Sequence, residues 1–312
     1  MMDLPFGEKL LRRLTDRIPP DAVFQLTPGY LTGLRVSKRD RSVRGRFIRP
    51  FREAPLKPSF DRPNVTQEAA LLDFVGRATK ELRLAGGTVS LLVPEACVRV
   101  FILAVETVPK TNQERDAFIR WRISRQMPNI PEDARIDHAA SSPRGAARII
   151  VSMARRAVIE EYESLFERNG LNVGVVTIPT LSLAHFTGPG DSSLLLNLEE
   201  DSISLLAVAG GEWALYRQKS LGPDGDPART FERRAAQVAM EISNTVRFLE
   251  DKEKKKVDRI RVRTGILDGG PEFLARLGGG LPFTVEPIDY QAPETWSAGE
   301  KSLLAPLAGQ IQ

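Results

Sequence analysis

Apolar residues alternate with turn signals in short runs through the first half of this chain, and the pattern is clearest between residues 89 and 137. Residues 89–93 and 98–105 are rich in Val, Ile, Leu and Phe, and Pro94-Glu95-Ala96 separates them. Runs of this length around a turn predict buried strands rather than a helix.

A capped helix is predicted directly after these strands. Thr111-Asn112-Gln113-Glu114 matches the capping box, in which the Thr hydroxyl and the Glu carboxylate each accept a hydrogen bond from a backbone amide. Met127-Pro128 ends the helix, because Pro lacks an amide hydrogen and clashes with the preceding turn. The apolar residues of this helix are Phe118, Ile119, Trp121 and Ile123.

The rest of the chain repeats the alternation of short strands and amphipathic helices. Before residue 89 the pattern predicts two strands within residues 21–37, around the turn Thr27-Pro28-Gly29, and a helix that starts at Asn64 or Thr66 and runs to Leu84. After residue 137 the predicted strands are 147–151, 173–178, 193–198, 202–208, 212–218, 259–264 and 283–288. The predicted helices there are 155–169, a short one at 179–184, a long one from Phe231, 271–277 and 300–307.

Composition describes an ordinary globular protein. The chain has 312 residues, of which 42% are hydrophobic and 27% charged, enough for about two domains. Cys97 is the only cysteine, so no intrachain disulfide can form and a reducing cytosolic setting is expected. No apolar run approaches the roughly 18 residues that span a bilayer, and no secretory signal opens the chain. We therefore expect a cytoplasmic protein.

Two basic segments stand out against a net charge of only +4. Residues 4–18 have helical spacing with four interleaved cations, which is typical of a membrane-surface helix or of a terminal helix packed on the body. Residues 38–62 carry nine Lys and Arg against three acids. This segment could contact the phosphates of lipid or nucleic acid, or form a solvated hairpin followed by an irregular loop.

No motif predicts catalysis. The chain has no Walker lysine loop, no Gly-rich dinucleotide turn and no metal-ligand spacing, since His138 and His185 are far apart. A Cys97–His138 nucleophilic pair stays open, although a lone Cys between two apolar runs is typical of packing. We predict no catalytic residue and no metal site.

The stretch from residue 89 to 178 resembles the PilM family of type IV pilus assembly proteins, which are cytosolic, actin-like and related to the cell-division protein FtsA. The segments that carry the resemblance are 90–94, 98–109, 114–128, 132–137, 148–153, 158–168 and 170–173. It implies an α/β fold of the actin-like (ribonuclease H-like) class, with two lobes and an inserted FtsA-type subdomain. The implied parts are an N-terminal basic helix (1–20), a first lobe (21–190) with the insert at about 96–172, and a second lobe (191–312).

Actin-like proteins bind ATP and a metal between the lobes, on two Asp-Gly hairpins and a Gly-Gly turn. This chain departs from that pattern at both hairpins, where it reads Gln25-Leu26-Thr27-Pro28-Gly29 and Asn197-Leu198-Glu199-Glu200-Asp201. Glu199 brings bulk and negative charge to a place where phosphate needs a close backbone. The residues of this degenerate nucleotide cleft are Thr27, Gly29, Asn197, Glu199, Gly269 and Gly270. We expect no cofactor and a pseudo-ATPase, with ATP and Mg²⁺ disfavoured.

The resemblance also implies a partner. PilM proteins capture the cytosolic N-terminal segment of PilN, a single-pass inner-membrane protein, in a groove beside the insert. Strand 98–105 would offer an edge for main-chain pairing, and Phe101, Phe118 and Trp121 are candidate anchors unless they belong to the core. The resemblance thus implies an adaptor that lies at the inner membrane through a PilN-like partner and contacts other platform or motor components.

Two alternatives remain open beside this adaptor. One is a working ATPase of the same machinery, and the other is a basic protein that binds a membrane surface or nucleic acid. The GspL proteins of type II secretion share the fold but carry a membrane span in the same chain, so the PilM resemblance is favoured. No nucleic-acid partner is expected.

Overall fold

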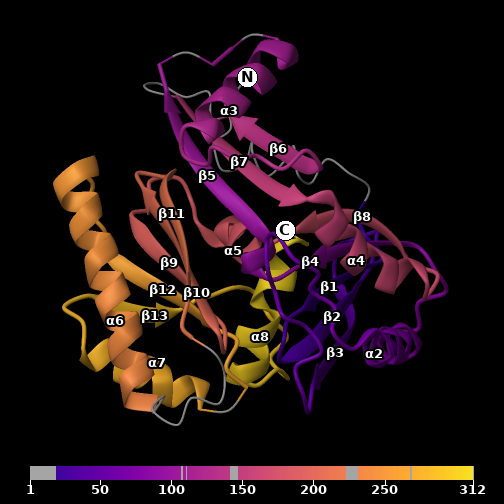
Figure 1. The fold of residues 1–312 in the computed structure, drawn as a ribbon. Helices are drawn as coiled ribbons and strands as arrows, with labels where there is room; N and C mark the ends of the chain where they lie inside the picture. The colour runs from indigo at the N-terminus through magenta and orange to yellow at the C-terminus, as the bar shows by residue number, and fades with distance from the viewer. Residues whose placement is uncertain are drawn as a thin grey trace.

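The computed structural model describes residues 19–106, 108–109, 111–140, 147–222, 231–267 and 269–311. Figure 1 shows three parts: a lobe on the right, a second lobe on the left, and a smaller sheet with one helix above them. The N-terminal helix expected over residues 1–20 lies almost wholly outside the described residues.

The first lobe is built on a five-stranded sheet of order β3-β2-β1-β4-β8. Its strands are β1 (Ala22–Leu26), β2 (Tyr30–Val36), β3 (Val43–Pro50), β4 (Thr88–Leu92) and β8 (Asn172–Thr177). The first three form an antiparallel meander, while β4 pairs in parallel with β1 and β8. The turn at Thr27-Pro28-Gly29 is confirmed between β1 and β2. The basic hairpin expected after residue 38 contributes β3.

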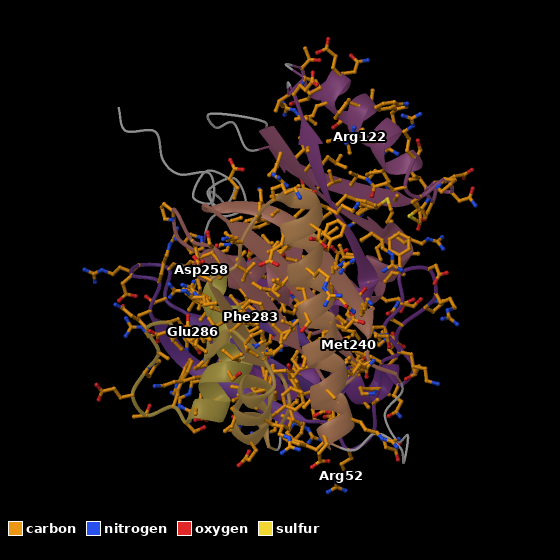
Figure 2. All side chains as sticks on the ribbon, turned by 90° about the vertical axis from the view of Figure 1, so that its left-hand side faces the viewer. Arg52, Arg122, Met240, Asp258, Phe283 and Glu286 are labelled. Atoms are coloured by element: carbon orange, nitrogen blue, oxygen red, sulfur yellow. The ribbon has the colours of Figure 1, made fainter. Side chains whose placement is uncertain are left out.

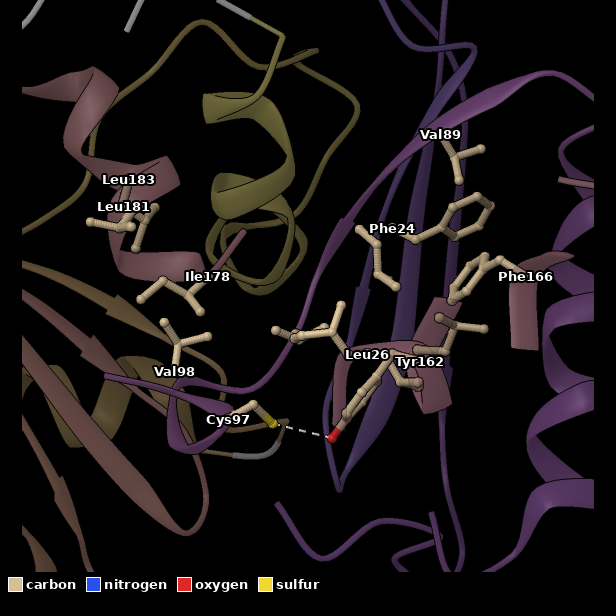
Figure 3. Packing of buried hydrophobic residues seen from close by; sticks show 14 of the residues in the cluster. Phe24, Leu26, Val89, Cys97, Val98, Tyr162, Phe166, Ile178, Leu181 and Leu183 are labelled. Atoms are coloured by element: carbon tan, nitrogen blue, oxygen red, sulfur yellow. Dashed lines mark hydrogen bonds between the residues drawn. The ribbon is translucent and has the colours of Figure 1, made fainter. Parts of the chain in front are cut away.

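Helices cover both faces of this sheet, as expected when successive side chains are buried on alternate sides. On one face lie α2 (Glu68–Glu81) and α4 (Arg156–Glu167), and Phe24 packs there on Phe166 with ring centroids 5.1 Å apart (Figure 3). On the other face α8 (Ala298–Gly309) packs Leu304 and Leu307 against Val23. The last helix of the chain therefore returns to the first lobe.

The predicted start of α2 at Asn64 or Thr66 is wrong. The helix begins at Glu68, and Gln67 at its N-cap makes no side-chain hydrogen bond. Asn64 is fully buried instead, where its Oδ1 accepts from the Ser59 amide at 2.6 Å and its Nδ2 donates to the Arg62 carbonyl at 2.7 Å. Asn64 thus satisfies the loop before the helix rather than the helix itself.

The second lobe repeats the same strand order, β11-β10-β9-β12-β13. Its strands are β9 (Ser193–Leu198), β10 (Ser202–Ala209), β11 (Glu212–Ser220), β12 (Arg259–Thr264) and β13 (Thr284–Pro287). Its helices α6 (Phe231–Phe248), which continues as a π-helical turn η3 (Leu249–Glu253), and α7 (Gly270–Gly279) pack on the Leu194, Leu196 and Leu198 face of β9. The opposite face of β9 is turned toward the first lobe.

The third part is the inserted subdomain, which leaves the first sheet after β4 through the 3₁₀ turn η1 (Glu95–Cys97). Its sheet has the order β5-β7-β6, formed by β5 (Val98–Val105), β6 (Ala134–Ala140) and β7 (Ala147–Arg155). Helix α3 (Asn112–Ser124) lies on it, and both hydrogen bonds of the predicted capping box between Thr111 and Glu114 are present. The chain then returns to the first lobe through α4 and β8, and α5 (Pro179–Leu183) and the short turn η2 (Ala184–Phe186) lead on to the second lobe.

Candidate functional site

The turns after β1 and β9 face each other between the lobes, and a buried carboxylate joins them. Glu199, just past the end of β9, is 8% exposed. It accepts hydrogen bonds from two residues of the first lobe, the Tyr30 hydroxyl at 2.8 Å and Gln25 Nε2 at 3.0 Å. The predicted site residue Glu199 therefore lies in the cleft and is hydrogen-bonded to the opposite lobe.

A buried guanidinium supplies the opposite charge. Arg263 on β12 has no exposed surface and forms an ion pair with Glu199. It also donates to the Tyr30 hydroxyl at 2.6 Å, to Asn197 Oδ1 at 3.0 Å and to the Ser302 carbonyl of α8 at 3.1 Å. These bonds link both lobes and the C-terminal helix through one side chain.

The two charges of this cluster compensate each other. Burial raises the pKa of Glu199, and the Arg263 charge acts in the opposite direction. Burial disfavours the charge on Arg263, but Glu199 and Tyr30 beside it raise its pKa above the ordinary value. Since Glu199 receives donors from three residues, it acts as an ionised acceptor paired with a permanent cation.

The backbone closes tightly around the pair. Gly265 follows β12, and a Cβ at this position would overlap Glu199 Oε2 and the Tyr30 hydroxyl. Only glycine allows the carboxylate to lie against the main chain here. The space between the two hairpins is therefore filled by the protein's own side chains.

The hairpin of the first lobe is satisfied internally as well. The Thr27 hydroxyl accepts from the amides of Gly29 at 3.2 Å and Tyr30 at 3.0 Å. These are amides that a bound phosphate would have to recruit. Thr27, which is buried, thus occupies the donors of its own turn.

A second buried acid continues the polar cluster toward the insert. Glu95, in η1, accepts from the Thr180 amide at 2.7 Å, the Thr180 hydroxyl at 2.5 Å and the Tyr216 hydroxyl at 2.5 Å. Burial raises its pKa, and the hydrogen bonds from Thr180 and Tyr216 offset this in part. Asn197 Nδ2 lies 3.4 Å from Glu95 Oε1, and its Oδ1 accepts from Arg263, so Asn197 links the second acid to the Glu199–Arg263 pair.

Gly269 and Gly270 lie at the start of α7. Gly269 has φ 78°, the left-handed region, and is the N-cap of the helix. A Cβ on it would lie 3.6 Å from the ring of Phe231, which is 38% exposed. Neither glycine takes part in the Glu199–Arg263 cluster, so the structure does not gather all six predicted cleft residues into one site.

The three aromatic residues predicted for partner binding differ in exposure. Phe101 and Phe118 are half-buried and pack against the core between α3 and its sheet, whereas Trp121 is 51% exposed. The Arg125 guanidinium lies 5.0 Å from the Trp121 ring centroid. Figure 2 shows Arg122 on the same helix, at the top of the molecule, far from Met240 on α6. The edge strand predicted at 98–105 is β5, which pairs with β7 along one side.

Cys97 is a packing residue and not part of a nucleophilic pair. It is fully buried, and its thiol donates to the Tyr162 hydroxyl at 3.4 Å (Figure 3). Burial raises its pKa to about 12. His138 lies on β6 of the insert, with its Nδ1 3.8 Å from Asp116. Within the described residues, no three His, Cys, Asp or Glu side chains are placed to hold a metal ion.

Comparisons with known proteins identify the fold. No protein-family profile and no curated protein matches the sequence. The structure of a PilM-PilN type IV pilus biogenesis complex matches with a TM-score of 0.75 and 16% identity, over 95% of this chain and 98% of that one. The chain has a PilM-like, actin-like fold.

Two further structures agree with this fold. The cytoplasmic domain of EpsL, an inner-membrane component of the Vibrio cholerae type II secretion system, matches with a TM-score of 0.51 and 10% identity over 93% of both chains. A Bacteroides thetaiotaomicron protein with an actin-like ATPase fold and unknown function matches with a TM-score of 0.53 and 8% identity, over 95% of this chain and 98% of that one. No helix in the described part of this chain has the length and apolar character to span a bilayer.

An actin-like fold implies a nucleotide and a metal ion between the lobes, and the cleft residues do not fit these groups as they stand. A carboxylate lies between the hairpins, where phosphate would meet repulsion. The turn amides of the first lobe are bonded to Thr27, and the buried Arg263 cation is already paired with Glu199.

Several residues of this cluster were not predicted from sequence. They are Gln25, Tyr30, Glu95, Arg263 and Gly265. Arg263 offered the one available signal, since a charged residue in a strand covered on both faces needs a buried partner. The alternation Arg259, Arg261, Arg263 along β12 conceals this, because it matches a strand with one solvated face.

Proposed function

We propose that this protein is a non-catalytic adaptor of a type IV pilus or related secretion platform. The Glu199–Arg263 pair of the second lobe carries the proposal, because both residues are hydrogen-bonded to Tyr30 of the first lobe where actin-like ATPases hold phosphate. A nucleotide there would have to displace Glu199 from Tyr30, Gln25 and Arg263. Leaving one of two buried charges without its partner costs about 3–5 kcal/mol.

The partner in this proposal is the cytosolic segment of a PilN-like protein. The likeness to a PilM-PilN complex over 95% of the chain supports it. Strand β5 lies at the edge of its sheet, so an extended segment could pair along the side that does not face β7. Trp121 stands exposed on the neighbouring helix, and a large aromatic ring is a common anchor at such interfaces.

One observation favours the alternative of a nucleotide-binding ATPase. Gly269 forms a left-handed N-cap on α7 next to the exposed ring of Phe231, so the Gly-Gly turn of the actin-like pattern opens a helix here. Calorimetry with Mg-ATP at millimolar concentration separates the two proposals. The adaptor proposal expects no saturable heat, and saturable binding or turnover would overturn it in favour of the ATPase.

A peptide experiment tests the partner separately. A fluorescent peptide of the N-terminal cytosolic segment of a PilN-like protein encoded beside this one should bind the full chain. Trp121→Ala should weaken binding at least tenfold, whereas Met240→Ala, which removes another exposed apolar side chain, should leave it unchanged. Equal affinity of both variants would remove Trp121 from the interface, and no binding to the parent protein would refute the partner.

A further inference from the structure

An open bowl of about 650 Å³ lies at the outer end of the first lobe's sheet. It is formed by the start of β1, the turn between β2 and β3, and the loop from α2 to β4. Because β1 and β4 run in parallel from this end toward the cleft and the insert, the bowl lies at the opposite end of the sheet from both. None of its lining residues takes part in the Glu199–Arg263 cluster.

Positive charge dominates the lining. The charged residues are Arg35, Lys38, Arg44 and Arg83 against the single acid Asp21. Lys38 is 2.9 Å from Asp21, and Arg44 is 2.9 Å from Asp40 in the adjoining turn. The side chains of Arg35 and Arg83 make no hydrogen bond or ion pair with any other residue of the described ranges. Two guanidinium groups therefore face the bowl region with their donors available to a ligand.

Arg83 occupies a backbone position where glycine is the usual residue. It follows the end of α2 with φ 54°, and the Arg83 and Leu84 amides donate to the Lys80 and Thr79 carbonyls, each at 3.0 Å. This is the Schellman motif, whose left-handed residue is most often Gly because a Cβ is disfavoured there. A cation suits the C-terminal end of a helix, but it does so equally from the preceding turn, where no left-handed backbone is needed.

We propose that this bowl binds a phosphate group, carried either by a soluble phosphate compound or by an anionic lipid headgroup. A guanidinium presents paired donors that match phosphate oxygens, and a phosphate carries more charge than a carboxylate. The bowl's volume falls within the roughly 300–1,000 Å³ of ligand sites. The inference does not rest on the adaptor function, because the bowl is remote from the cleft and from α3.

The test uses the full chain and three probes. Inorganic pyrophosphate is titrated by calorimetry, vesicles of phosphatidylglycerol in phosphatidylcholine are co-sedimented, and a poly-glutamate peptide serves as the carboxylate comparison. Binding of at least one phosphate probe is expected, and it should weaken as salt rises. Pyrophosphate binding would identify a soluble ligand, and vesicle binding alone a lipid headgroup.

Variants locate the site. Arg35→Gln and Arg83→Gly should each weaken phosphate binding at least tenfold. Arg83→Gly should also leave the Tm unchanged or higher, since glycine suits the left-handed position, so lost binding would not reflect unfolding. Arg52→Gln removes an exposed charge beyond the cleft end of β3 and should bind like the parent.

Three outcomes would overturn the proposal. They are failure of both phosphate probes to bind, equal binding by all variants, and tighter binding of poly-glutamate than of both phosphate probes. Each of these is independent of whether a PilN-like peptide binds at the insert.

Discussion

The interlobe cleft and the outer face of the insert treat their polar and aromatic groups in opposite ways. In the cleft, Glu199 and Arg263 are buried and bonded to each other and to Tyr30. On the insert, Trp121 stands 51% exposed beside Arg125 on a helix whose other face is buried by Ile119 and Ile123. Polar and aromatic side chains thus bind one another in the cleft, whereas on the outer face of the insert they face solvent.

This contrast indicates where a ligand can gain free energy. A buried group that already has its hydrogen bonds loses them before it can bind anything else, and the loss of a buried charge partner costs several kcal/mol. An exposed aromatic ring loses mainly water when a partner covers it, which favours burial against that partner. The cleft is therefore suited to hold the lobes together, and the face of α3 to meet another protein.

The largest effect is expected from breaking the cleft pair. Arg263→Met leaves Glu199 buried without its cation and should lower the free energy of unfolding by about 3–5 kcal/mol, measured by urea denaturation. Adding Glu199→Gln should restore much of this, because no unpaired charge then remains.

Arg259→Met is the matched control on the same strand. Arg259 is 47% exposed and lies 3.7 Å from Glu286, so its loss should cost less than about 1 kcal/mol. Equal costs for Arg259→Met and Arg263→Met would show that the cleft pair does not hold the fold.

A smaller effect should separate the two faces of α3. Ile119→Ala opens a cavity in the core of the insert and should cost about 2–4 kcal/mol of unfolding free energy. Trp121→Ala, two residues away, should cost less than about 1 kcal/mol, because half of its surface is already in solvent. A larger loss for Trp121→Ala than for Ile119→Ala in the same urea measurement would place Trp121 in the core and contradict its role as an anchor.

The smallest effect concerns pH and the second buried acid. Burial raises the folded pKa of Glu95 above its ordinary 4.5, so the folded state binds the proton more tightly than the unfolded state. Its contribution is then fully present below pH 4.5 and is lost as pH rises through the folded pKa, with a slope of at most about 1.4 kcal/mol per pH unit.

Comparison with Glu95→Gln isolates the pH-dependent contribution of Glu95 to stability. The parent protein should lose unfolding free energy relative to Glu95→Gln as the pH rises above 4.5. A difference that stays flat between pH 4 and about 8 would mean that Glu95 has the same pKa in both states, contrary to its burial.

Local features of this fold were predictable because they depend on residues close in sequence. The capping box needs only Thr111 and Glu114, and the turn after β1 needs only Thr27-Pro28-Gly29. The residue at which a helix begins was harder to predict. Helix α2 begins at Glu68, because Asn64 makes contacts with Ser59 and Cys97 instead of capping the helix. Cys97 lies 33 positions away, so the sequence around Asn64 does not reveal this contact.

The sequence by itself determined the succession of strands and helices, the departure of both hairpins from the phosphate-binding pattern, and the presence of an aromatic, basic helix. Only the tertiary structure decided what the departing residues do, because the hydrogen bond between Glu199 and Tyr30 joins positions 169 residues apart and that between Arg263 and Tyr30 joins positions 233 apart. The tertiary structure also decided that Ile119 is buried and Trp121 exposed. Both residues are apolar, so the sequence alone does not show which side of the helix packs on the sheet.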